Sequence, residues 1–428
     1  MKIIKRVNFP DLSSVFKYSY IFFTLLIMSG KSLAEQNSDP ANLTLKESIL
    51  LSLDEHPDLQ TFTHQQRMYE QLTVEAGKGE KASVELMLED IGGSGIYQGT
   101  DSAQATLSIS WIMDGAQVEK RLDSVQIEAS SIEIKQKIKA LDISAETSRL
   151  FIKVIVYQDR LKLTKQAERQ AIETLKTIER KIKIGKSSET ERLQAKVDVL
   201  NHGLMVEEIE ETLRSAKYQL FAQWGGKQDS HQITGELFVR PQVDNIESSL
   251  HQVTQHPMLQ LLLTQQRITE SKVALAVAES QPKWKFSAGL RQHEAVQETS
   301  FVAGFSVPWG KSPKSLSEVS RYQAAQATSI SEIESMKRKL DSELFVLIQQ
   351  IKHSQHEIGV IENEILPLLQ EAKVVSTKAY ENGKLSFREW MLSQQDLLAA
   401  RQKRLTAYYN LHLQHIELQR LTGKSLYQ

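Results

Sequence analysis

The chain has 428 residues, of which 40% are hydrophobic and 25% are charged, and its formal net charge is −1. A chain of this length and composition can bury a substantial core and form more than one domain. It has no cysteine, which excludes disulfides, thiolate metal ligands, a cysteine nucleophile and a lipid attached to an N-terminal cysteine.

Residues 1–34 are typical of a secretory signal peptide. Basic residues near the start precede an apolar run over 20–28, and the small residues Ser32 and Ala34 predict cleavage after Ala34. An uncleaved anchor is the weaker alternative, because this run is shorter than the ~20 residues that span a bilayer. Cleavage removes five basic side chains and one acidic one, so the exported chain is mildly acidic and we expect no nucleic-acid partner.

The first half of the exported chain predicts helices that enclose a β-hairpin. A helical pattern covers residues 44–81, and two strand-like segments around a glycine-rich turn follow it. A very long helical stretch then covers 116–184, Gly185 breaks it, and another helix runs to about residue 224.

The long stretch has a narrow apolar seam, with apolar residues three and four positions apart. Examples are Ile134, Ile138, Leu141 and Ala145, and later Ile172, Leu175, Ile178 and Ile182. Such a seam is typical of coiled coils, and at about 1.5 Å per residue this helix would extend for roughly 100 Å. A helix of that length needs partners along its whole length.

The second half repeats the first. The motif that begins His56-Pro57 recurs at His256-Pro257, and the turn at Gly185-Lys186 recurs at Gly383-Lys384. Since the matches keep the same order, they indicate an internal duplication. We therefore divide the chain into a signal peptide (1–34), a first structural repeat (35–226), a connecting segment (227–245) and a second structural repeat (246–428).

The elements of the second repeat follow the order of the first. We expect a helix over 248–279, two strands within 284–309, a long helix over 314–382, a break, and a helix over 387–421. Pro367 should kink the long helix, because proline lacks a backbone donor and clashes with the preceding turn.

The strand-like segments are the most informative part of the sequence, because apolar and polar residues alternate in all of them. The apolar positions include Leu107, Ile109, Trp111, Phe286, Phe301 and Phe305. At about 8–11 residues the segments have the length of tilted strands that cross a bilayer, so we assign these six side chains to a lipid-facing surface. Hairpins packed on a soluble core would alternate in the same way, and this alternative stays open.

Four strands cannot close a barrel, and an open sheet edge in lipid leaves backbone groups unpaired at several kcal/mol each. The predicted fold is therefore mainly α with a β-barrel portion. Long coiled-coil-like helices form a tunnel, and two β-hairpins per subunit contribute to a transmembrane barrel shared among copies.

With these elements in place, the chain resembles the TolC-like outer-membrane efflux family from Leu43 to Gly423. The resemblance rests on the start of each repeat, around His56-Pro57 and His256-Pro257, and on Leu366-Pro367 followed by Gly383 and Ser386. The repeat start is most similar to the heavy-metal (CzcC-like) branch. The resemblance implies a homotrimer in outer-membrane lipid, a periplasmic tunnel, a periplasmic adaptor protein and an inner-membrane efflux pump.

On this resemblance the two helical turns would be the adaptor-facing tips. Their residues are Gly185, Lys186, Ser188, Gly383, Lys384 and Ser386. Glu189, Glu191 and Glu389 are the acidic candidates for a ring that narrows the pore, because symmetry turns one carboxylate into a ring. The alternative is that these carboxylates cap or line helix starts.

No residue pattern indicates catalysis, a cofactor or a metal centre. His353 with His356 and His412 with His415 stand one helical turn apart, but pairs without a third ligand are usually ordinary polar positions. We expect a non-enzymatic exit duct of a tripartite efflux system, carrying heavy-metal cations. The alternatives are an exit duct for drugs or secreted proteins, and a secreted or surface coiled-coil structural or adhesion protein.

Overall fold

The computed structural model describes residues 41–226, 231–241, 256–310 and 313–424. The predicted signal peptide, part of the connecting segment and the predicted start of the helix at 248 lie outside these residues. The chain divides into a unit Met1–Ala41 and a unit Asn42–Gln428, and the second unit contains the helices and the main sheet.

The predicted helical stretch over 44–81 consists of two helices, α1 (Leu45–Glu55) and α2 (Pro57–Ala76), and it ends at Ala76, before the predicted end at residue 81. The break falls at His56-Pro57, because proline fits the first turn of a helix and disfavours helix in the residue before it. The Nδ1 of His56 accepts the backbone N–H of Asp58 at 3.2 Å. His256 caps α6 (Pro257–Glu279) in the same way, accepting from Met258 at 3.1 Å.

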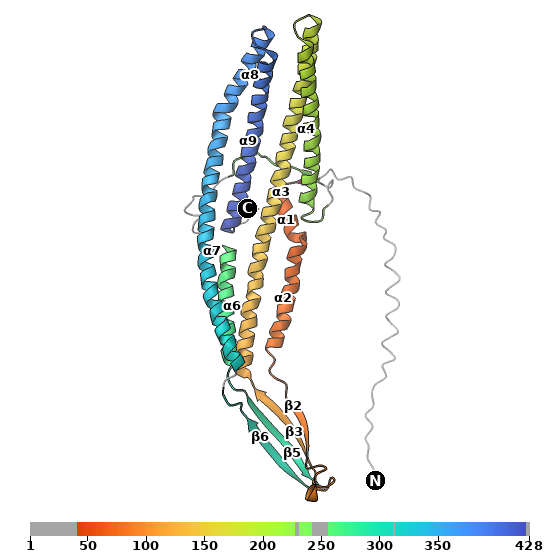
Figure 1. The fold of residues 1–428 in the computed structure, drawn as a ribbon, viewed down its shortest axis with the longest axis vertical. Helices are drawn as coiled ribbons and strands as arrows, with labels where there is room; N and C mark the ends of the chain where they lie inside the picture. Colours follow the sequence, from red (N-terminus) through yellow and green to blue (C-terminus); the bar gives the residue numbers. More distant parts are fainter. Residues whose placement is uncertain (1–40, 227–230, 242–255, 311–312, 425–428) are drawn as a thin grey trace, which may run out of the picture. The chain divides into compact units, whose positions relative to one another are not determined.

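The predicted long helix is confirmed. α3 (Gly115–Lys183) has 69 residues and is followed, after the turn at Gly185, by α4 (Glu189–Phe221). α3 runs beside α2 and α6 over one part of its length and beside α4 and α9 (Phe387–Thr422) over the other (Figure 1). It therefore has helical partners along its length, as its seam requires.

The long helix of the second repeat changes its hydrogen-bond pattern just before Pro367, where a kink was predicted. α7 (Pro313–Val360) passes through a short π-helical segment, Ile361–Ile365, into α8 (Leu366–Glu381). Pro367 is the second residue after that segment. A π-turn shifts the hydrogen-bond register, so it accommodates the missing donor of proline at a bend without ending the helix.

The main sheet has four antiparallel strands in the order β2-β3-β5-β6. The strands are β2 (Ser83–Glu89), β3 (Gln104–Met113), β5 (Trp284–His293) and β6 (Glu298–Ser306). β6 ends three residues before the predicted end at Trp309, because Pro308 cannot donate to a strand ladder. The two hairpins, one from each repeat, join through β3 and β5, with Leu107 opposite Leu290.

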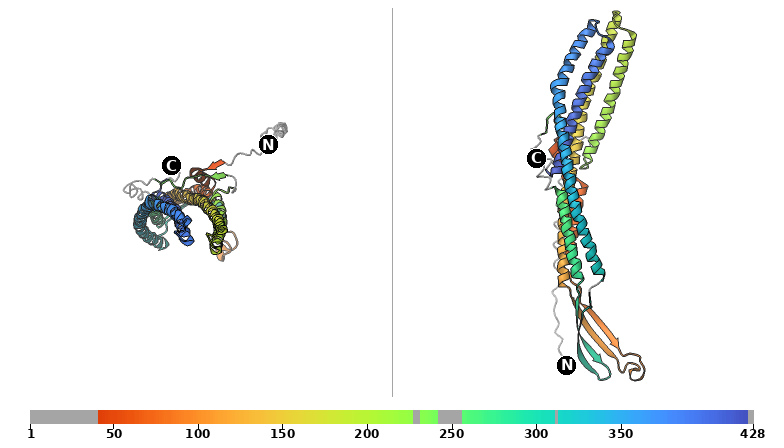
Figure 2. Two further views of the ribbon diagram at one scale, coloured as in Figure 1. Left: turned by 90° about the horizontal axis from the view of Figure 1, so that it is seen from above. Right: turned by 60° about the vertical axis from the view of Figure 1, so that its left-hand side comes forward.

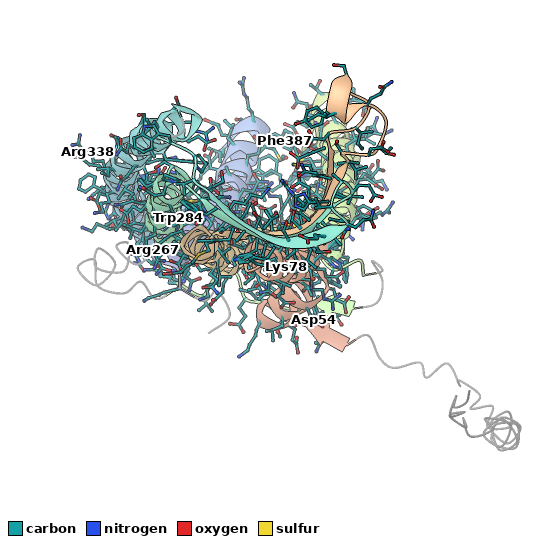
Figure 3. The ribbon with its side chains drawn as sticks, turned by 90° about the horizontal axis from the view of Figure 1, so that it is seen from below. Asp54, Lys78, Arg267, Trp284, Arg338 and Phe387 are labelled. Carbon is teal, nitrogen blue, oxygen red and sulfur yellow. The ribbon has the colours of Figure 1, made fainter. Side chains whose placement is uncertain are left out.

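The sheet continues from the ends of α2, α3, α6 and α7, and the turns of the α3/α4 and α8/α9 hairpins lie at the opposite end of the helices (Figure 1). In Figure 3, seen from below, the sheet is a curved layer across the helix ends, and Trp284 marks the start of β5. Seen from above, α8, α9, α3 and α4 follow an arc, and β4 (His231–Ile233) lies on its outer side (Figure 2).

The largest core lies where the two repeats meet at mid-length of the helices. Its buried side chains come from α1, α3, α4, α7 and α9, and include Ile49, Val154, Leu344 and Leu411. Ile233 and Leu237 from the connecting segment are buried in the same core. The backbone N–H of Thr234 donates to the carbonyl of Leu43 in β1 (Ala41–Leu43) at 3.1 Å, which fastens this segment to the start of the first repeat. Among the described residues, no helix has an apolar stretch of the length that a bilayer crossing requires.

Gly289 of β5 allows the two hairpins to pair closely. A Cβ at this position would lie 2.5 Å from the carbonyl oxygen of Leu107 and 2.7 Å from the Cβ of Ser108. Both are on the neighbouring strand β3, so neither can move without opening the ladder.

We expect Gly289→Ala to separate β3 from β5 and to destabilise the chain by about 1–3 kcal/mol, the usual cost of overpacking. Gly359→Ala in α7 is the matched control, because a Cβ there meets open space and alanine is the better helix former. Urea unfolding of both purified proteins, followed by circular dichroism, measures the difference. Equal midpoints for Gly289→Ala and the wild type would contradict the close-contact interpretation.

Candidate functional site

The turns at the tips of the two helical hairpins have the same backbone geometry. Gly185 and Gly383 both have positive φ, +70° and +71°. At the first turn the N–H of Lys186 donates to Lys181 O at 2.8 Å, and at the second Lys384 donates to Ala379 O at 2.9 Å. This pattern closes a helix C-terminus around a left-handed residue, a conformation that glycine adopts without steric cost.

Serines start the outgoing helix at both tips. The Ser188 hydroxyl accepts the backbone N–H of Glu191 at 3.2 Å, and the Ser386 hydroxyl accepts that of Glu389 at 3.3 Å. At the second tip the Glu389 carboxylate also accepts the backbone N–H of Ser386 at 3.0 Å, which completes a capping box. These bonds from Ser386 hold the pKa of Glu389 below its usual value.

The other two acidic candidates also have partners within their own hairpin. Glu189 accepts from Arg192 Nε at 2.9 Å, and this bond lowers the pKa of the carboxyl. Glu191 accepts the hydroxyl of Ser187. All three carboxylates therefore stabilise helix starts within the subunit, which is the alternative role that the sequence leaves open.

An aromatic cluster holds the two tip hairpins together. Tyr380 of α8 stacks on Trp390 of α9, with ring centroids 4.5 Å apart and an interplanar angle of 4°. Phe387 packs against both rings, and Ile178 of α3 and Ala195 of α4 complete the buried cluster. This cluster is thus the contact through which the first repeat supports the second at the tip.

Charged and polar groups of the tip surround the same cluster. Lys181 Nζ lies 3.8 Å from the centroid of the Tyr380 ring, a cation–π contact, and Trp390 Nε1 donates to Thr377 at 3.1 Å. Burial and, to a smaller degree, the negative charge of Glu191 raise the pKa of the Tyr380 hydroxyl. Sequence reasoning did not identify this cluster. Its signal was the presence of three aromatic residues, Tyr380, Phe387 and Trp390, close to the turn at Gly383.

The sheet presents its apolar side to the exterior. Leu107 is 56% exposed and Phe301 70%, whereas Thr106 and Ser110 on the other side of β3 are only 6% and 3% exposed. Of the six predicted lipid-facing residues, Leu107, Ile109, Trp111, Phe301 and Phe305 are exposed, and Phe286 is half-buried. Two neighbouring aromatic rings shield Phe286. Its ring stacks with those of Trp111 and Trp284, at centroid distances of 6.1 Å and 6.3 Å.

Hydrogen bonds cross the strands on the polar side of the sheet. Arg291 of β5 donates to Thr106 at 2.9 Å and to Gln104 at 3.1 Å, and it pairs with Glu89 of β2 at 2.9 Å. One guanidinium therefore joins three adjacent strands. The apolar side of this sheet contributes no residue to the hydrophobic cores of the described chain, whereas a sheet in a water-soluble domain packs its apolar side on a core.

The histidine pairs lie away from any metal-binding group. His412 Nε2 is 2.8 Å from the carbonyl oxygen of Leu237, so this ring fastens the connecting segment to α9. Burial lowers the pKa of its imidazole, which favours the neutral form. Within the described part of the chain, no three His, Cys, Asp or Glu side chains are arranged to hold a metal ion.

The comparison with known proteins agrees with this geometry. No family model matches the chain. It is 21% identical over 286 residues to the cobalt-zinc-cadmium resistance protein CzcC of Cupriavidus metallidurans, covering 66% of this chain and 68% of that protein.

Several solved structures are similar over about nine tenths of the chain, and two of them serve as examples. The outer membrane protein VceC of Vibrio cholerae has a TM-score of 0.73 at 13% identity, covering 90% of this chain and 97% of that one. The open-state outer membrane channel MtrE of Neisseria gonorrhoeae has a TM-score of 0.71 at 11% identity, covering 90% of both chains. The chain has the fold of the outer-membrane efflux channels, and its resemblance to the TolC-like family is confirmed.

We expect Trp390→Ala to destabilise the tip by about 3–5 kcal/mol, because it removes a large buried ring and its hydrogen bond. Trp390→Phe keeps a stacked ring and loses only the bond to Thr377, so it should cost about 1 kcal/mol. Limited proteolysis at the two tips, followed by mass spectrometry, measures the local opening. Equal cleavage of both variants would show that the stacked ring does not hold the hairpins together.

Proposed function

We propose that this protein is the outer-membrane channel subunit of a tripartite efflux system, a passive exit duct with no enzymatic activity. The observation that best supports this proposal is the exposed apolar side of the sheet at one end of the long helices. Its apolar side suits lipid, and its polar side, with the Arg291 network, suits a water-filled interior. In a secreted structural or adhesion protein the exposed apolar side would meet water, which disfavours that alternative.

We propose further that the sheet closes into a barrel with other copies of the chain. β2 and β6 are the edges of the sheet and have no further partner strand within the described chain. Three copies would supply about twelve strands under rotational symmetry, in line with the homotrimer of the resembled family.

One helix, α4, has an exposed apolar surface that suits contact with a neighbouring copy of the chain. Leu193, Val197, Leu200 and Leu204 form an exposed apolar row on α4, spaced four, three and four residues apart. That is the spacing of a coiled-coil seam, and it supports a subunit contact along α4.

The duct would extend into the periplasm through the helices, with the tips at Gly185–Ser188 and Gly383–Ser386 facing the adaptor and the inner-membrane pump. Glu189, Glu191 and Glu389 are the acidic side chains at these tips, and a symmetric assembly would repeat each around the aperture. Heavy-metal cations are the proposed cargo, because the curated relative is a cobalt-zinc-cadmium resistance protein.

Leu107→Arg tests the membrane assignment. On a lipid-facing surface the substitution should cost about 2–4 kcal/mol and prevent insertion into the outer membrane. Glu85→Arg, on the polar side of β2, is the matched control and should insert normally. Membrane fractionation and trimer migration on unheated gels measure insertion. Normal insertion of Leu107→Arg would contradict the channel assignment.

Deletion of the gene tests the cargo. Loss of a heavy-metal exit duct should lower the tolerated concentration of cobalt, zinc or cadmium and leave tolerance of dyes and antibiotics unchanged. Growth across a concentration series, with the wild-type gene restored as control, measures this. Sensitivity to drugs alone would replace the metal cargo by a drug cargo without affecting the channel assignment.

A further inference from the structure

A recess of about 400 Å³ lies above the connecting segment, between α3, α8 and α9. Its lining includes Lys162 of α3, Gln370 of α8, Arg401 and Arg404 of α9, and Phe238 of the connecting segment. These residues define the cationic recess.

The positive charges of the recess exceed the negative charges that face them. Lys162 pairs with Asp159 at 2.9 Å, the acidic residue in the lining. Arg404 has one carboxylate nearby, Glu362 at 4.0 Å. Glu362 already pairs with Arg240 at 3.0 Å and accepts the Tyr408 hydroxyl at 3.1 Å, so little of its acceptor capacity remains for Arg404.

Arg401 has even less compensation. Within the described chain no carboxylate oxygen lies within 4.0 Å of its guanidinium. Lys373 of α8 has a pKa that is lowered first by burial and then by the positive charge of Arg401. The positive charge of Arg401 is therefore not neutralised by a described ion pair, and a bound carboxylate would supply the missing negative charge.

Arg404 is also held ready for a ligand. Its guanidinium carbon lies 4.2 Å from the centroid of the Phe238 ring, and this contact fixes the orientation of its planar fork. Its Nε atom is buried and has no hydrogen-bond partner in the described residues. A buried donor without a partner is uncommon and costs stability unless something else satisfies it.

We propose that the cationic recess is a docking site for an acidic segment of a protein partner, in which an Asp or Glu side chain binds to Arg401 and Arg404. Arginine forms paired hydrogen bonds with carboxylates, and arginine and aromatic residues are enriched at protein interfaces. The recess is open along one side, so it would leave a small free anion largely in water, whereas small-molecule sites enclose most of their ligand. An acidic side chain carried by a larger partner fits this opening better. The proposal does not depend on the channel function.

The test uses the full chain purified in detergent and a fluorescein-labelled hexaglutamate peptide, with anisotropy as the measurement. We expect saturable binding that Arg401→Gln weakens by about tenfold, the effect of one lost charge-assisted contact of roughly 1.4 kcal/mol. Arg338→Gln is the matched control, because Arg338 is an exposed arginine on α7 paired with Glu334. It should bind the peptide as the wild type does.

A second variant keeps both arginines. Gln370→Glu places a carboxylate in the recess, where it should occupy Arg401 and weaken peptide binding by a similar factor. Circular dichroism melting verifies that each variant is folded. Absence of saturable binding by the wild type, or equal weakening by Arg338→Gln and Arg401→Gln, would overturn the proposal. Free glutamate or succinate that binds as tightly as the peptide would also overturn it, since the recess would then be a site for small carboxylates.

Discussion

The structure depends on the hydrogen-bonding requirement of one four-stranded sheet. Its apolar side faces outward, and its edge strands, β2 and β6, carry backbone donors and acceptors that no described strand satisfies. In lipid an unpaired edge is far more costly than in water. A sheet of this kind therefore needs other strands to pair with its two edges. The proposed shared barrel is the arrangement that meets this requirement.

The long helices also need partners, in their case to cover their apolar side chains. A helix in a protein gains most of its stability from packing of its apolar face, and the 69-residue α3 is covered in turn by different neighbours along its length. The connecting segment adds Leu237 to the core that the two repeats share. The carbonyl oxygen of Leu237 also contacts the His412 ring of α9. The segment that joins the repeats therefore also fastens them.

At the far end the same duplication gives two tips that look alike in sequence but differ in function within the subunit. Both have a left-handed glycine and a serine cap. The second tip carries the aromatic rings of Tyr380, Phe387 and Trp390, and the first provides the small side chain of Ala195 against which they pack. The difference makes the hairpins complementary, so that each repeat stabilises the other where no core surrounds them.

The sequence by itself determined the elements, because their signals are local. Alternation along β3, the three-and-four spacing along α3, and glycine or proline at the breaks each act within a few residues. The early end of β6 before Pro308 was missed, although its cause is equally local.

Only the tertiary structure decided which side of the sheet is exposed, how Tyr380 meets Trp390, and which partners the tip glutamates take. It also brought Arg401, Arg404 and Phe238 around one recess from separate segments. Such contacts join residues far apart in the chain, and a single sequence carries no local signal for them. Local sequence patterns determine where a helix or strand forms and which of its sides is apolar. Tertiary packing determines which residues each side contacts.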